Sequence, residues 1–171
     1  SNGLWLGETF SEFNNYPTGI INVNGQYTLG GIQNVGILNN FGLIVYGNNY
    51  QSKYGLQNLG TINNKQSGTI KVNNSSQYAI TNQQNAEFNN EGSIQIGGIS
   101  NIGATGIFNR FDAIWNNYAT GNIQIDRFTD VGISNGQDAT STFNNSGSIS
   151  IGNTIGGSYG INNIDKFNNL Q

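Results

Sequence analysis

Short segments of alternating apolar and polar residues recur along the whole chain. One segment reads GTIKV from Gly68, GSIQI from Gly92, GNIQI from Gly121 and GSISI from Gly147, with looser versions GIINV from Gly19 and GLIVY from Gly42. A period of two predicts β-strands, because alternate side chains then point to opposite faces of a sheet. The residues that this pattern turns inward are Ile94, Ile96, Ile123, Ile125, Ile149 and Ile151, and those that it turns outward include Ser93, Gln95, Gln124 and Ser150.

The dipeptide Asn-Asn marks a longer repeat. Seven such pairs begin at positions 14, 39, 63, 89, 116, 144 and 168, so that successive members of this set are 24 to 28 residues apart. One apolar residue precedes each pair: Phe13, Leu38, Ile62, Phe88, Trp115, Phe143 and Phe167. A third segment closes each unit with an asparagine in a fixed place: Asn34, Asn58, Asn82, Asn109, Asn135 and Asn163.

Each unit has room for three strands of about five residues, with bends rich in Gly, Asn and Ser between them. One unit cannot bury its own apolar face, but stacked units can. We therefore predict a right-handed parallel β-helix, or β-solenoid, of about six coils of 24–28 residues with three short strands per coil. The rival fold is a β-sandwich, which would favour hairpin turns at a closer spacing.

In such a stack, equivalent residues of successive coils lie directly above one another. Asparagines at bends can then form an amide ladder, and we expect Asn34, Asn58, Asn82, Asn109, Asn135 and Asn163 to do so. The apolar residues before each Asn-Asn pair should form a core stack inside the coils. We expect residues 1–171 to form a single β-helix domain, either a fragment of a longer repeat protein or one protomer of a fibre.

Composition excludes several kinds of chemistry. The chain has no Cys and no His, so it has no thiol nucleophile, no disulfide, no imidazole base and no zinc site of the usual kind. With 6 Lys+Arg against 9 Asp+Glu, it lacks the basic surface that nucleic acids require. No apolar run approaches the roughly 20 residues that span a bilayer. We expect no cofactor, no nucleic-acid partner and no membrane insertion.

Acidic residues offer one candidate for catalysis or metal binding. Asp112, Asp126, Asp130 and Asp138 form the densest acidic group, with Arg110 and Arg127 nearby in sequence. A carboxylate pair could hydrolyse glycosidic bonds or bind Ca²⁺. The other interpretation is that these residues keep exposed loops soluble, and no spacing here matches a known metal-binding motif.

Aromatic residues in the loops offer a second candidate, because the loops after the second strand vary most between units. Tyr27, Tyr50 and Phe128 lie in them and could stack on sugars if they are exposed. On the second strand, Ile20, Leu43 and Val45 are apolar outward positions, whereas later equivalents are polar. Such a patch suggests lateral packing between rods, although scattered exposed residues would look the same.

The segments FNNEGSIQIG from Phe88 and FNNSGSISIG from Phe143 resemble β-solenoid repeats of large bacterial surface and secreted proteins. Filamentous-haemagglutinin-like adhesins and Asn/Gly-rich repeat proteins of Bacteroidetes look similar. The resemblance covers essentially the whole chain and implies secretion with a structural, adhesive or fibre-forming role. It transfers no catalytic residue.

Together, the repeat and the resemblance predict an extracellular structural protein without enzymatic activity. The expected role is a β-helical rod that self-associates, head-to-tail or laterally, into a surface filament, sheath or matrix, or that decorates one. The first alternative is a carbohydrate-binding adhesin module acting through Tyr27, Tyr50 and Phe128 on a surface polysaccharide. The second is a polysaccharide-acting enzyme that uses the acidic group.

Overall fold

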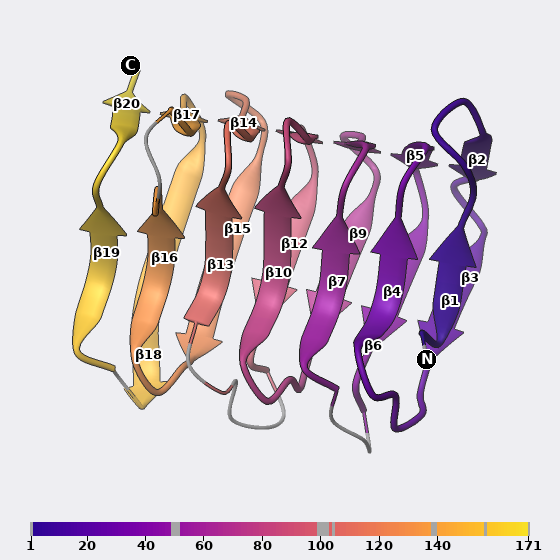
Figure 1. Cartoon of the computed structure of the whole chain (residues 1–171), viewed down its shortest axis with the longest axis horizontal. Coiled ribbons are helices and arrows are strands. Elements are labelled where there is room, and N and C mark those ends of the chain that lie inside the picture. The colour runs from indigo at the N-terminus through magenta and orange to yellow at the C-terminus, as the bar shows by residue number, and fades with distance from the viewer. Residues whose placement is uncertain are drawn as a thin grey trace.

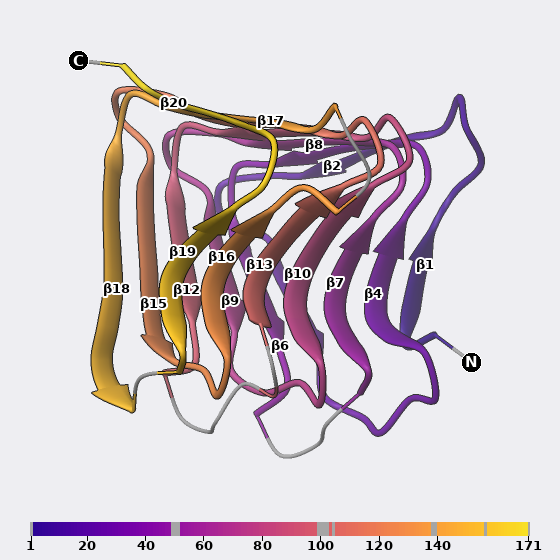
Figure 2. The same ribbon diagram turned by 60° about the vertical axis from the view of Figure 1, so that its left-hand side comes forward.

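The computed structural model describes residues 2–48, 52–98, 103, 105–137, 140–155 and 157–170, and for residues 153–155 the backbone alone. The described residues form twenty β-strands and no helix. They wind into a right-handed solenoid whose termini lie at opposite ends of its long axis (Figure 1). Figure 2 shows the three sheets arranged around the axis of the solenoid. The predicted fold class is confirmed.

The chain visits the three sheets in the same order in every coil. Sheet A contains β1 (Leu4–Leu6), β4 (Gly30–Asn34), β7 (Tyr54–Asn58), β10 (Tyr78–Gln83), β13 (Thr105–Arg110), β16 (Val131–Asn135) and β19 (Tyr159–Asn163). Sheet B contains β2 (Glu12–Asn15), β5 (Ile37–Asn40), β8 (Thr61–Asn64), β11 (Glu87–Asn90), β14 (Ile114–Asn117), β17 (Thr142–Asn145) and β20 (Lys166–Asn169). Sheet C contains β3 (Ile20–Val23), β6 (Leu43–Tyr46), β9 (Thr69–Val72), β12 (Ser93–Ile96), β15 (Asn122–Arg127) and β18 (Ser148–Ile155).

Neighbouring strands are parallel and in register, and they come from successive coils. Phe88 pairs with Ile62 on one side and with Trp115 on the other, so the repeat in the sequence becomes a column in space. The described chain makes six complete coils and the sheet A and sheet B strands of a seventh. Parallel pairing rules out the β-sandwich, which is built from antiparallel strands.

Glycine opens each corner between sheets B and C because successive coils approach closely there. A Cβ on Gly92 would lie 2.3 Å from the carbonyl oxygen of Gly68 and 2.4 Å from that of Lys65. Gly121 meets the Asn90 carbonyl oxygen in the same way, at 2.5 Å. From the second coil onward, the glycine that starts each predicted strand segment is therefore required by the distance between coils.

The interior is filled by columns of aliphatic side chains. Ile94, Ile96, Ile123 and Ile125 are fully buried, as the alternating pattern predicted, and Ile149 and Ile151 are half-buried against the core in coil six. The space between sheets A and C is narrow: a Cβ on Gly31 would lie 2.0 Å from the ring of Tyr46. Glycine at this position of sheet A thus leaves room for a large residue of sheet C.

Candidate functional site

The candidate functional feature of this solenoid is a set of hydrogen-bonded side-chain columns. The first, which we call the AB ladder, lies at the corner between sheets A and B and contains the predicted Asn34, Asn58, Asn82, Asn109, Asn135 and Asn163. Each Nδ2 donates to the Oδ1 of the next coil at 2.8–2.9 Å. The predicted asparagine ladder is confirmed.

Backbone carbonyls also hold the AB ladder in place. Asn109 Nδ2 donates to the carbonyl oxygen of Ala113 at 3.2 Å within its own corner and to that of Thr142 at 3.1 Å in the next coil. Asn58 makes the equivalent bonds to Gly60 and Glu87. Each buried amide therefore joins two coils and also closes the bend that follows its strand.

A second column, the BC ladder, lies at the corner between sheets B and C and is buried except at its last member, Asn169. It contains the second asparagine of every Asn-Asn pair: Asn15, Asn40, Asn64, Asn90, Asn117, Asn145 and Asn169. Its links are 2.7–2.8 Å long and also run from each Nδ2 to the next coil. We did not predict from the sequence that these residues form a ladder. The signal was present, since each lies two positions after an inward apolar residue.

A third column, the outer ladder, runs along the outer surface of sheet B. It contains the first asparagine of every pair: Asn14, Asn39, Asn63, Asn89, Asn116, Asn144 and Asn168. Its links are 2.7–3.0 Å long, but here each Nδ2 donates to the preceding coil. The outer ladder therefore runs opposite to the two buried ladders.

The predicted core stack is a continuous column in sheet B. Leu38, Ile62, Phe88, Trp115 and Phe143 are fully buried. The ring centroids of Phe88 and Trp115 are 4.0 Å apart, those of Trp115 and Phe143 5.6 Å, and those of Phe143 and Phe167 4.9 Å, all nearly parallel. Phe13, in the first coil, is 41% exposed, and Phe167 is half-buried.

A few buried polar atoms in these columns have no hydrogen-bond partner. Asn34 Oδ1 is one, because the residue paired with Asn34 in the first coil is Leu6. Trp115 Nε1, within the core stack, is another. A buried polar atom without a partner costs stability, so both positions are weak points in otherwise satisfied columns.

A separate stack of aromatic rings lies on the outer face of sheet A. Tyr78 lies between Tyr54 and Phe108, with ring centroids 5.7 Å and 4.9 Å away. Lys53 Nζ lies 5.1 Å from the centre of the Tyr54 ring, and the Arg110 guanidinium lies 4.6 Å from that of Phe108. Cations thus cover both ends of this stack. Because the ring faces contact one another, they are not free for a sugar.

Neither of the two predicted sugar-binding residues that the structure describes is fully exposed. Phe128 is only 3% exposed and belongs to the core, so its prediction as an exposed ligand-stacking residue is wrong. Tyr27 is half-buried and packs against the core. Tyr50 lies outside the described residues. The loop before sheet A turns Phe128 inward, which the spacing of the repeat could not reveal.

The acidic residues lie at different corners of the solenoid. Asp112 lies between sheets A and B in a left-handed conformation with φ of 61°, whereas Asp130 immediately precedes the sheet A strand β16. A sheet A strand of five residues, about 16 Å at 3.3 Å per residue, separates these corners. Asp112 and Asp130 therefore do not lie together, and Asp138 lies outside the described residues.

Asp126 stays on the outer face of sheet C, where Gln124 Nε2 donates to both carboxylate oxygens at 2.9 and 3.0 Å. Within the described part of the chain, no three Asp or Glu residues come close enough to hold a metal ion.

The early outward residues of sheet C form a smaller apolar patch than their sequence pattern suggests. Ile20 is highly exposed and Leu43 is half-buried, but Val45 is buried between its neighbours at 9% exposure. The patch therefore depends mainly on Ile20, in the first coil.

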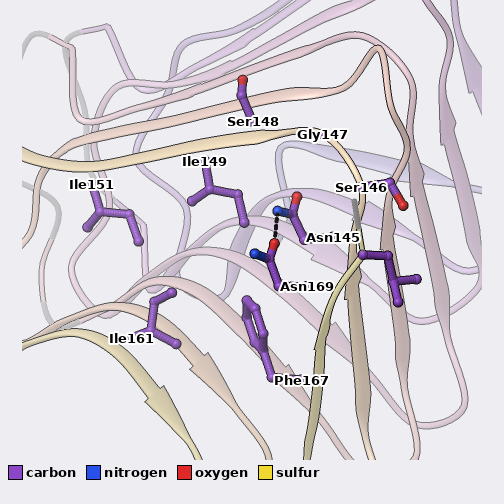
Figure 3. Close-up of a pocket in the computed structure, with 10 residues that line it drawn as sticks. Asn145, Ser146, Gly147, Ser148, Ile149, Ile151, Ile161, Phe167 and Asn169 are labelled. Carbon is purple, nitrogen blue, oxygen red and sulfur yellow. Dashed lines mark hydrogen bonds between the residues drawn. The ribbon is translucent and has the colours of Figure 1, made fainter.

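A hollow of about 660 Å³ opens beside β18, at the end of the solenoid that carries β19 and β20 (Figure 3). Its apolar wall is made by Ile149, Ile151, Ile161 and Phe167, the inward residues of coils six and seven. Asn145 and Asn169, which end the BC ladder, lie at its polar edge (Figure 3). The hollow continues the interior of the coils and presents no titratable side chain.

Tyr46 is the described residue whose pKa is most clearly altered by the fold. Burial raises the pKa of its hydroxyl above the ordinary value, and the neighbouring Ser52 acts in the opposite direction. The hydroxyl of Tyr46 therefore stays protonated inside the core at neutral pH.

A scan against protein-family models gives no match, and searches of curated proteins and of solved structures give none either. None of the described segments is a helix that could cross a membrane.

Proposed function

We propose that this protein is an extracellular structural rod without enzymatic activity, which builds or decorates a surface filament, sheath or matrix. The observation that supports the proposal is the continuity of the BC ladder and the outer ladder, whose links join every pair of neighbouring coils in sheet B at 2.7–3.0 Å. Repeat proteins derive their stability from contacts between adjacent units, and these ladders add side-chain bonds to the backbone bonds at every interface.

The ladders also supply the physical mechanism of a stiff rod. Each amide–amide bond contributes about 0.5–1.5 kcal/mol in net terms, and leaving a buried partner unpaired costs about 1–3 kcal/mol. Sliding or bending one coil relative to the next would break bonds in several columns together. The rod should therefore resist shear between coils as one cooperative structure.

We further propose that rods associate head-to-tail through sheet B. The BC ladder turns Asn15 Oδ1 toward one end of the solenoid and Asn169 Nδ2 toward the other, and the outer ladder does the reverse with Asn14 and Asn168. A second copy stacked in the same direction would place its acceptors opposite the donors of the first copy, and its donors opposite the acceptors. A reversed copy would place donors opposite donors and acceptors opposite acceptors.

Charge supports the same direction of stacking. Glu12 and Lys166 occupy the same outward column, at the first position of β2 and of β20. Stacking β2 of one copy on β20 of another therefore puts opposite charges on adjacent strands, an arrangement that stabilises a sheet. The next coil of a longer polypeptide would contact the same groups. The proposal therefore concerns what the surfaces of β2 and β20 can bind.

Sedimentation velocity and electron microscopy over a wide range of concentrations test the proposed association. We expect the chain to form linear oligomers and Lys166→Glu, which places two carboxylates together, to weaken association several-fold at low salt. The double variant Glu12→Lys, Lys166→Glu restores the pairing and should restore association. Dispersed monomers at the highest concentration, or oligomers unaffected by both variants, would contradict head-to-tail stacking.

A further inference from the structure

Two tyrosines on the outer face of sheet A are held together by the register of the solenoid. Tyr54 begins β7 and Tyr78 begins β10, and the two residues pair directly across the parallel strands of coils three and four. Their ring centroids are 5.7 Å apart and their planes differ by 21°. Because both residues are fixed by backbone pairing, the rings remain adjacent whenever the coils are folded.

The neighbours of the pair restrict where the two rings can move. Phe108 covers the far face of Tyr78 at a centroid distance of 4.9 Å, and Lys53 lies over the Tyr54 ring at 5.1 Å. Both tyrosines are half-buried, so a part of each ring remains accessible from solvent. Each phenol can therefore meet an external oxidant, while its nearest aromatic partner with a hydroxyl group is the other tyrosine.

We propose that Tyr54 and Tyr78 form an oxidative cross-linking site that joins coils three and four covalently. The co-reactant is a peroxidase-type one-electron oxidant with hydrogen peroxide. Each phenol loses one electron and one proton to give a phenoxyl radical, and the two radicals couple through ring carbons ortho to oxygen. Loss of the two ortho protons to the phenolic oxygens restores both aromatic rings. Overall, two hydrogen atoms leave the protein and one peroxide becomes two waters.

The other described tyrosines provide a comparison. Tyr16, Tyr118 and Tyr159 are more exposed, at 68%, 44% and 59%, yet no ring–ring contact described in the structure involves them. Exposure alone would make them react first and link separate molecules. Fixed proximity instead favours the Tyr54–Tyr78 pair, since a pair held in contact behaves as if it were highly concentrated.

Peroxidase with hydrogen peroxide, applied to the whole dilute protein, tests the proposal. Trypsin cleaves after Lys53, Lys65, Lys71 and Arg110, so Tyr54 and Tyr78 fall in the separate peptides 54–65 and 72–110. We expect mass spectrometry to find these two peptides joined with the loss of two hydrogens. Their yield should be independent of protein concentration and about tenfold above that of any other tyrosine pair.

Phenylalanine variants supply the controls, because they retain the ring and remove the phenol. Tyr54→Phe and Tyr78→Phe should each abolish the joined peptide while the circular dichroism spectrum of the fold stays unchanged. Tyr118→Phe should leave its yield unchanged. The proposal is overturned if the 54–65 and 72–110 peptides stay separate while other tyrosines couple, or if cross-linking yields only products between molecules.

Discussion

Asn89 and Asn90 are adjacent in the chain, yet their side chains donate in opposite directions along the solenoid. Asn89 Nδ2 donates to Asn63 in the preceding coil at 3.0 Å, and Asn90 Nδ2 donates to Asn117 in the following coil at 2.7 Å. Asn90 is fully buried at its corner, whereas Asn89 lies on the outer face of sheet B. The same residue type thus serves two ladders that differ in exposure and in direction.

This difference predicts unequal effects of alanine substitution. Asn90→Ala removes a buried acceptor and donor, so that Asn64 Nδ2 loses one of its acceptors and Asn117 Oδ1 loses the donor from Asn90. The free energy of unfolding should therefore fall by about 2–4 kcal/mol. Asn89→Ala should lower it by at most about 1 kcal/mol, because water can replace a half-exposed partner. Urea unfolding measures both. Equal losses for the two variants would contradict the structural distinction between the ladders.

Glycine at the corner between sheets B and C should be essential where coils are stacked on one another. Gly92→Ala places a Cβ 2.3 Å from the Gly68 carbonyl oxygen, and we expect destabilisation of about 1–3 kcal/mol. Gly160→Ala is the control, since no atom lies within 4 Å of its Cβ position, and its effect should stay within about 0.5 kcal/mol. Thermal unfolding compares the two variants, and a harmless Gly92→Ala would refute the tight corner.

The core stack should accept another aromatic ring at Trp115 and reject a small side chain. Trp115→Phe keeps a ring between Phe88 and Phe143 and removes the unpartnered Nε1, so stability should change by less than about 1.5 kcal/mol. Trp115→Ala should cost about 3–5 kcal/mol because it leaves a large cavity. Chemical unfolding followed by circular dichroism distinguishes them. Similar losses for both variants would mean that the indole is required for more than its packing.

Tyr46 should make the fold sensitive to alkali. The unfolded hydroxyl has a pKa of about 10, and burial raises the folded pKa above that value. Below about pH 10 the folded and unfolded states both hold the proton, so the contribution of Tyr46 to the free energy of unfolding is fully present. As the pH rises toward the folded pKa, the unfolded state loses its proton first, and the stability therefore falls.

Tyr46→Phe removes this titration and serves as the control. The urea midpoint of the unmodified chain should fall more steeply above about pH 10 than that of the variant. Parallel alkaline curves for the two proteins would show that Tyr46 contributes nothing to the pH dependence.

The repeat in the sequence was sufficient to predict the coils, the core stack and the AB ladder, because residues such as Phe88 and Asn82 recur at spacings that only stacked coils explain. The direction of each ladder was not predictable. The two ends of an asparagine amide have nearly the same shape, and nearby carbonyls, such as those of Ala113 and Thr142 around Asn109, decide which end points to the next coil.

The outer faces and the loops were harder to predict. Phe108 looked like an ordinary strand residue, and its place in a stack with Tyr54 and Tyr78 depends on the outward columns of sheet A. Phe128 was placed on the surface because loops of different length hide the direction of their side chains, and it is buried. Periodicity therefore predicts which side chains of the paired strands point inward, but not the direction of the side chains in the loops between sheets C and A.

Hydrogen exchange of the asparagine side-chain amides, resolved by nuclear magnetic resonance, is the decisive test of the ladders. We expect the Nδ2 protons of Asn64, Asn90 and Asn117 in the BC ladder to exchange as slowly as backbone amides of the buried strands. Those of Asn63, Asn89 and Asn116 in the outer ladder should exchange faster. Exchange of every asparagine side chain at the rate of a free amide would contradict this expectation.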